Sequence, residues 1–226
     1  MINLFVGKHG IEIGGPSSLF LDSIPIYRQA SGIDGVNFSD STVWEGEIKE
    51  GKTYKTPGGG EIIGHQYIAD GTDMPQIKTG LYDFLISSDC LEHIANPLKA
   101  LLEWARIIKN GAPMLLVLPN KVQNFDNKRQ FTTFEHILQD FNQNIGENDL
   151  THLPEVLSLH DLPLDPDAGT FENFTRRSLD NFNNRCIHHH VFHIPLIEIM
   201  LTHVGFEVQD IQENPISFTT LAIKKG

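Results

Sequence analysis

The sequence is poor in cysteine and has no long hydrophobic run. Its only two cysteines, Cys90 and Cys186, are too few for a disulfide framework or a four-thiolate zinc site. No apolar stretch approaches the roughly 20 residues that span a bilayer, and Lys8 and His9 interrupt the apolar core that a signal peptide would need. We therefore expect a cytoplasmic protein that is neither a disulfide-stapled secreted domain nor bound to a membrane.

Basic residues are scarce as well. The 226 residues include 17 Lys and Arg against 29 Asp and Glu, which gives a net charge of −12. An acidic protein repels phosphate backbones, and no basic patch stands out, so nucleic acid is not an expected partner. Hydrophobic residues make up 40% and charged residues 20% of the chain, which is typical of a globular protein and excludes disorder as its main state.

Apolar strands alternate with helical segments along the chain. The clearest helix begins at Asn96 and Pro97, carries apolar residues three and four positions apart, and stops at Gly111. Residues 114–118 form an uninterrupted apolar run, which is typical of a parallel strand covered on both faces. Further strands are predicted near residues 10–15, 32–36, 65–70 and 81–88. The alternation predicts an α/β fold with a doubly wound, mostly parallel sheet.

Residues 121–190 break this alternation with polar, aromatic and histidine-containing sequence. From residue 195 the pattern returns as a helix followed by two strands, near 206–208 and 218–223. We interpret residues 1–226 as a single domain, because the length suits one domain with an elaboration. The helical and loop insertion at 121–190 precedes the last helix and hairpin.

A glycine turn follows the first predicted strand. Glu12 lies on that strand, and Gly14 and Gly15 follow it. A sheet of this kind binds its ligand outside the carboxyl ends of its strands, and glycine lets the backbone pass close to a ligand. A Gly-Gly-Pro turn is also common without a ligand, so the turn alone leaves both interpretations open.

Acidic residues recur where the next three strands are predicted to end. Asp34 is placed at the end of the second strand, where its carboxylate could hold both hydroxyls of a ribose. Asp70 ends the third strand, where it could accept a hydrogen bond from an adenine amine, and Ser88 and Asp89 end the fourth. Each of these residues alone could be a cap or turn residue, but their succession favours one ligand site.

Residues 82–94 have the sequence Tyr-Asp-Phe-Leu-Ile-Ser-Ser-Asp-Cys-Leu-Glu-His-Ile, and an ordered series of segments follows them, at 96–98, 103–106, 109–111 and 115–119. This block resembles the central stretch of class I S-adenosylmethionine-dependent methyltransferases. The family's glycine-rich first motif, second-strand acid and adenine-contacting loop are similar to residues 12–17, 32–34 and 70–75. The resemblance covers about residues 8–120 and 190–224 and does not extend to the insertion.

The resemblance implies a seven-stranded Rossmann-like sheet, S-adenosylmethionine as cofactor and methyl transfer as the activity. It implies cofactor-binding roles for eight residues: Glu12, Gly14, Gly15, Asp34, Asp70, Gly71, Ser88 and Asp89. The chain departs from the family at Pro16 and Ser18, which stand where the second and third glycines of the turn would be. Proline has no N–H and a fixed φ, so the turn must be tighter. A non-catalytic binding protein of the same fold therefore remains an alternative.

Histidines are the candidate bases for proton removal from the methyl acceptor. His93 follows the fourth strand, and His189 lies in the run His188–His190; we predict these two, His93 and His189, as catalytic. The insertion adds His136, His152 and His160, so a metal-dependent enzyme is a further alternative.

No His-x-x-x-His pair on a predicted helix and no Cys-x-x-Cys pair accompanies these histidines, and adjacent histidines on an extended segment point to opposite faces. We therefore favour an acceptor-site wall over a metal site and assign no metal ligands, and ordinary loop histidines are the remaining alternative. The predicted acceptor is a small polar metabolite, such as a sugar or a carboxylate, and the insertion is predicted to act as its lid. The oligomeric state does not follow from the sequence.

Overall fold

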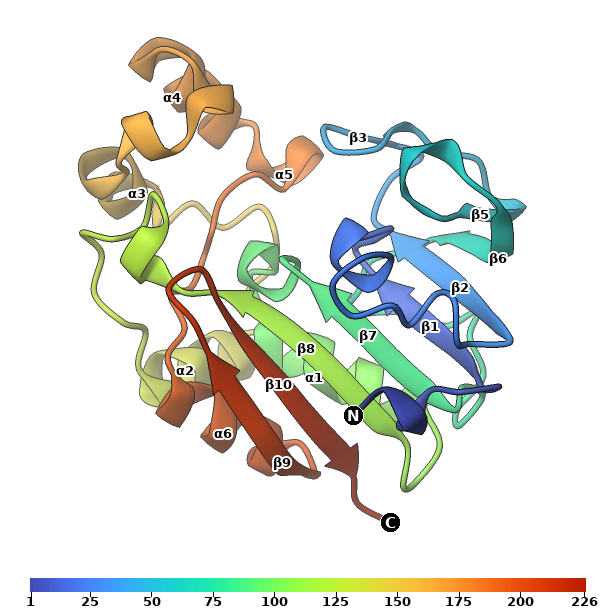
Figure 1. The fold of residues 1–226 in the computed structure, drawn as a ribbon. Coiled ribbons are helices and arrows are strands. Elements are labelled where there is room, and N and C mark those ends of the chain that lie inside the picture. The colour runs from blue at the N-terminus through green and yellow to red at the C-terminus, as the bar shows by residue number, and fades with distance from the viewer.

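An eight-stranded sheet forms the centre of the computed structural model, which describes residues 1–226 (Figure 1). From one edge to the other its strands are β5 (Gly51–Lys55), β6 (Ile62–Ile68), β2 (Gly32–Asn37), β1 (His9–Ile13), β7 (Phe84–Ser88), β8 (Pro113–Pro119), β10 (Ser217–Lys224) and β9 (Phe206–Glu213). A separate two-stranded sheet pairs β3 (Ser41–Thr42) with β4 (Gly46–Glu47).

Five neighbouring strands of the large sheet, β6, β2, β1, β7 and β8, run parallel. The antiparallel pair β10 and β9 completes one side, as the sequence pattern predicts. The predicted number of seven strands is wrong, because β5 adds an eighth, antiparallel to β6 at the other edge. This strand comes from a segment rich in Gly, Lys and Thr whose composition indicates a loop or exposed hairpin, and Tyr54 is its one buried side chain.

Three α-helices cover one face of the sheet (Figure 1): α1 (Pro97–Ile107), α2 (Phe134–Gln143) and α6 (Ile194–His203). Asn96 caps α1 by accepting a 3.1 Å hydrogen bond from the Lys99 N–H, and Pro97 fits the first turn because its missing N–H has no partner there. Trp104 is fully buried between α1 and the sheet. At 11 residues α1 is the longest helix, and none is long and apolar enough to cross a membrane.

The opposite face of the sheet is covered without α-helices. Short 3₁₀ turns at Ile2–Leu4 and Ser18–Phe20 lie over it, and their neighbouring aromatic residues fill the core. Phe5, for example, packs edge-on against Phe84 of β7 with ring centroids 5.1 Å apart. Ser17 caps the second of these turns by accepting a 3.3 Å hydrogen bond from the Leu19 N–H.

Residues 121–190 contain α2, α3 (Leu153–Leu159), α4 (Phe171–Leu179) and α5 (Asn181–Asn184). Helix α2 packs beside α1 and α6, whereas α3, α4 and α5 lie on the side of the sheet toward which the parallel strands point (Figure 1). A small core of their own, formed around Val156, Phe174 and Ile187, holds the latter group together.

Candidate functional site

A cavity of about 450 Å³ opens at the carboxyl ends of β1, β2, β6 and β7. Its walls come from the loops after these strands and from the segment 121–190, and they include Gly14, Ser17, Asn37, Asp70, Asp89, Glu92, His93, Phe125, Arg185 and His188. This is the place at which an open parallel sheet binds its ligand. The volume lies in the range of small-molecule sites, about 300–1,000 Å³.

The glycine turn forms one wall of the cavity. Gly14 has a φ of 80°, and a Cβ atom there would lie 2.5 Å from the Cys90 Sγ atom, so no other residue fits. Gly15 lies outside the cavity, where a Cβ atom would be 2.2 Å from the carboxyl carbon of Glu12. The predicted pair of glycines is therefore needed to bring the chain past Cys90 and over Glu12.

Glu12 lies beneath this turn and does not line the cavity. Its Oε2 atom accepts hydrogen bonds from the Tyr27 hydroxyl (2.5 Å) and the Tyr54 hydroxyl (2.6 Å), and Oε1 accepts one from the Ser17 N–H (3.0 Å). Burial raises the pKa of Glu12 to about 7, although these hydrogen bonds act in the opposite direction. The structure thus places Glu12 as a support of the turn.

The predicted position of Asp34 at the end of the second strand is wrong. Strand β2 continues to Asn37, because residues 35–37 still pair with β6. Asp34 lies outside the cavity, where it accepts hydrogen bonds of 2.7 Å from the Tyr82 hydroxyl and from the His65 N–H. Asn37 takes its place at the strand end, and the sequence-based prediction missed this residue.

The remaining predicted cofactor ligands, Asp70, Gly71, Ser88 and Asp89, all line the cavity. Asp70 accepts a 2.8 Å hydrogen bond from the Thr72 N–H and pairs with Arg185 at 3.2 Å. Burial raises the pKa of Asp70, but the contacts with Thr72 and Arg185 outweigh it and lower the pKa overall. The structure thus brings these four residues together with Gly14 around one space.

His93 lies at the other end of the cavity. Its ring packs between Trp44, with centroids 5.1 Å apart, and His188, with centroids 4.5 Å apart. Burial and the neighbouring His188 lower the pKa of His93 well below its usual value, and burial and Asp89 raise the pKa of Glu92. The Nδ1 atom of His93 and the Oε2 atom of Glu92 are buried and have no hydrogen-bond partner.

His188 lines the cavity as well, and its Nδ1 atom lies 2.6 Å from Oδ2 of Asp126. Burial raises the pKa of Asp126, but His188 and Arg129 outweigh this effect and bring the pKa to about 2. Arg129 also donates to the carbonyl oxygens of His188 (2.8 Å) and His189 (3.1 Å). The chain segment that carries His188 is thus fixed by a buried cation.

The predicted placement of His189 in the acceptor site is wrong. Its side chain points away from the cavity, and its Nε2 atom lies 3.1 Å from Asn181 Nδ2 and 3.5 Å from Glu147. Adjacent side chains on an extended segment alternate in direction, so His188 faces the cavity instead. The sequence predicted that neighbouring histidines alternate in direction. It did not predict which residue of the run His188–His190 faces the cavity.

The cavity walls are mostly acidic. Four carboxyl groups line it, those of Glu45, Asp70, Asp89 and Glu92, against the single guanidinium group of Arg185, although burial raises the pKa of Glu45 and Glu92. Such walls favour a cationic ligand over an anionic one.

Comparison with known proteins agrees with the sequence motifs. Residues 27–116, 90 of the 226 residues, match the model of a family described as a methyltransferase domain. This match supports the predicted family, the class I S-adenosylmethionine-dependent methyltransferases. The predicted Rossmann-like α/β fold is confirmed.

Solved structures similar to this chain share its fold at low sequence identity. A putative S-adenosylmethionine-dependent methyltransferase from Listeria monocytogenes is 15% identical, with 98% of this chain and 93% of that chain covered and a TM-score of 0.53. An S-adenosylmethionine-dependent methyltransferase from Mesorhizobium loti is 10% identical, with 97% and 92% covered and a TM-score of 0.54. A third is the 1,6-didemethyltoxoflavin-N1-methyltransferase of Burkholderia thailandensis, at 9% identity, 98% and 72% coverage and a TM-score of 0.52. A comparison with curated protein sequences finds no match.

Proposed function

We propose that this methyltransferase domain binds S-adenosylmethionine in the cavity and transfers the methyl group to a hydroxyl of a small polar metabolite of the sugar type. The observation that carries the proposal is that the Asp126–His188 pair opens into the same cavity as the glycine turn at Gly14. One space thus contains both a place for a donor and a side chain suited to remove a proton from an acceptor.

The residues at the strand ends fit the cofactor. Bound S-adenosylmethionine supplies a methyl group on a cationic sulfonium. We expect the backbone at Gly14 to pass close to the cofactor, Asn37 to hold its ribose, and Asp70 and Gly71 to border its adenine. The four carboxyl groups of the cavity walls favour the sulfonium charge.

The Asp126–His188 pair fits the role of general base. A carboxylate that holds the Nδ1–H of a histidine leaves Nε2 free to accept a proton. Asp126 orients His188 in this way, and Arg129 holds the carbonyl oxygens of His188 and His189. A base in position contributes about 10²- to 10⁴-fold to the rate, and alignment of donor and acceptor contributes the rest.

The surroundings of His188 favour a neutral, hydroxylated acceptor. A carboxylate acceptor would be repelled by Asp89, whereas a neutral hydroxyl group would not. A small-molecule acceptor also agrees with the Burkholderia neighbour, whose structure contains 1,6-didemethyltoxoflavin.

Residues 121–190 form the proposed lid over the acceptor. Phe125, Arg185 and His188 of this segment line the cavity, and Arg185 bridges to Asp70 on the cofactor side at 3.2 Å. The lid would keep water away from the transfer step.

Two measurements test this function in sequence. Isothermal titration with S-adenosylhomocysteine should give one site, and absence of heat with folded protein contradicts the proposal. Turnover is then measured as S-adenosylhomocysteine release with panels of sugars, amines and carboxylic acids, and the sugars are expected to respond.

His188→Gln should lower kcat by about 100-fold or more while cofactor binding stays, and His203→Gln, at an exposed position of α6, is the control. Cofactor binding without turnover on any panel would favour the non-catalytic alternative.

A further inference from the structure

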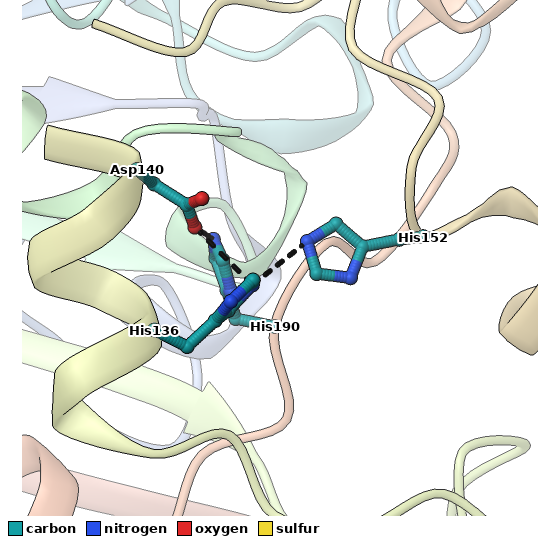
Figure 2. A group of neighbouring side chains, drawn as sticks. All are labelled: His136, Asp140, His152 and His190. Atoms are coloured by element: carbon teal, nitrogen blue, oxygen red, sulfur yellow. Dashed lines mark hydrogen bonds and ion pairs between the residues drawn. The ribbon is translucent and has the colours of Figure 1, made fainter. Parts of the chain in front are cut away.

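Outside the cavity, four potential metal ligands meet between α2 and the segment after α5. They are His136 and Asp140 on α2, His152 before α3, and His190, and we call them the His136 cluster (Figure 2). Their ligand atoms all lie within 4.8 Å of one another. None of the four lines the cavity.

We propose that the His136 cluster is a zinc site, in which three imidazole nitrogens and one carboxylate oxygen bind a single Zn²⁺ ion. This proposal is independent of the proposed transferase function.

The distances within the cluster agree with tetrahedral zinc. Zinc bonds to nitrogen and oxygen are about 2.0–2.1 Å long, which places two ligand atoms about 3.3 Å apart on a tetrahedron. His136 Nε2 lies 3.2 Å from His152 Nε2 and 3.4 Å from Asp140 Oδ2. Asp140 Oδ2 in turn lies 3.6 Å from His190 Nε2. Figure 2 shows the four side chains converging from three separate segments of the chain.

One buried ligand atom of the cluster, Asp140 Oδ2, lacks the partner that a purely hydrogen-bonded arrangement would provide. Asp140 Oδ2 has no hydrogen-bond partner although the side chain is only 9% exposed. His190, whose side chain is 0% exposed, has its Nε2 atom 3.2 Å from the Ala95 carbonyl oxygen and no partner at Nδ1. Buried polar atoms without partners are rare and call for an unseen ligand. A metal ion would satisfy Asp140 and would replace the single contact of His190 Nε2 with Ala95.

The donor set selects the kind of ion. Three imidazoles and one carboxylate suit zinc, whereas calcium and magnesium prefer oxygen ligands. Four protein ligands close the tetrahedron, and this is typical of a structural site. Half-exposed His136, at 36%, provides a route for the ion to enter.

A bound ion would tie the insertion to the rest of the domain. His136 and His190 are separated by 54 positions in the chain, and His152 belongs to the loop between α2 and α3. His190 is also two positions from His188 in the cavity wall, so the ion would restrain the backbone that carries this residue.

Metal content and cobalt binding test the proposal. Purified protein, grown with zinc, should contain about one equivalent of zinc by inductively coupled plasma mass spectrometry. After removal of the metal, Co²⁺ should give the intense visible absorption of tetrahedral cobalt and be displaced by Zn²⁺. A strong zinc chelator should lower the melting temperature of the wild-type protein.

Variants assign the metal to this cluster. His152→Ala and Asp140→Asn should weaken zinc binding by at least about 100-fold, because even changes in outer-shell residues cost up to that much. His203→Ala, on neighbouring α6, removes an exposed histidine and should leave zinc bound. His188→Ala tests the second group, Glu92, His93 and His188, and should also leave zinc bound.

The proposal is wrong if wild-type protein, loaded with excess zinc and desalted, retains less than about one tenth of an equivalent and gives no tetrahedral cobalt spectrum. It is also wrong if His188→Ala loses the metal while His152→Ala keeps it. The cobalt and chelator measurements use the wild-type chain, so they decide the question even where a variant fails to fold.

Discussion

The Tyr54 hydroxyl on β5 donates a 2.6 Å hydrogen bond to Glu12 on β1. To make it, the tyrosine ring crosses β2 above Gly35, where a Cβ atom would lie 2.0 Å from the ring. The eighth strand is thus connected to the turn that forms the cavity wall. Strand β5 therefore supports the cavity wall in addition to pairing with β6.

Gly35→Ala should destabilise the protein, because the added methyl group overlaps the Tyr54 ring. We expect a loss of roughly 1–3 kcal/mol, as for other overpacked cores. Urea unfolding followed by circular dichroism measures this change. Gly146→Ala is the matched control, since the nearest atom to its Cβ would be 3.4 Å away. Equal midpoints for the two variants would contradict the packing of Tyr54 over β2.

Glu12 should make stability depend on pH. Burial raises its pKa to about 7 in the folded protein, from 4.5, so the folded state binds this proton more tightly than the unfolded state. Glu12 therefore contributes to the free energy of unfolding, on the order of 3 kcal/mol in total. This contribution is fully present below pH of about 4.5 and is lost as the pH rises through about 7.

Glu12→Gln cannot titrate, so the free energy of unfolding of this variant should fall less between these pH values than that of the wild-type protein. His93, with its lowered pKa, makes the free energy of unfolding change with pH in the opposite direction. Because His93 is present in both proteins, the difference between the two curves reports Glu12. Urea titrations at half-unit pH steps supply both curves. Parallel curves would show that Glu12 is ionised throughout the range.

Asn37→Ala should weaken S-adenosylhomocysteine binding by about tenfold, the equivalent of one hydrogen bond. The variant removes the side chain at the end of β2 and its 2.9 Å hydrogen bond to the Gly15 carbonyl oxygen. Asp34→Asn should leave affinity unchanged within about twofold, since Asp34 lies outside the cavity, while it lowers the melting temperature. Isothermal titration compares the variants. A larger affinity loss for Asp34→Asn would restore that carboxylate as the ribose ligand.

Arg185→Ala should speed cofactor release. Arg185 joins the insertion to Asp70 at 3.2 Å and also pairs with Glu147 at 3.0 Å, with only 14% of its side chain exposed. Loss of a partly buried pair of this kind should raise the dissociation rate by about tenfold. Stopped-flow fluorescence of Trp44, which lines the cavity, can follow the release.

Arg176→Ala is the control for Arg185, because the side chain of this exposed residue of α4 donates a hydrogen bond only to Asn173 and does not line the cavity. The cofactor should dissociate from the Arg176→Ala variant at the same rate as from the wild-type protein. Similar rates for all three proteins would exclude the Arg185–Asp70 contact as a latch of the lid.

Local patterns in the sequence determined much of the architecture. The apolar run at 114–118, the capped helix after Asn96 and the final helix and hairpin all appear where they were predicted. Strand periodicity, caps and turn glycines depend on neighbouring residues, so they can be recognised without the fold. For the same reason positions 70, 71, 88 and 89, at or just past strand ends, could be grouped from the sequence, and all four line the cavity.

Tertiary structure alone decided the rest. Strand β2 extends past Asp34 because its neighbours keep pairing with it, and this places Asn37 in the cavity. His188 faces inward because buried Arg129 holds the carbonyl oxygens of residues 188 and 189. The His136 cluster joins residues up to 54 positions apart. Contacts between distant segments leave no periodic trace in the sequence, so only the folded chain reveals which side chains share one space.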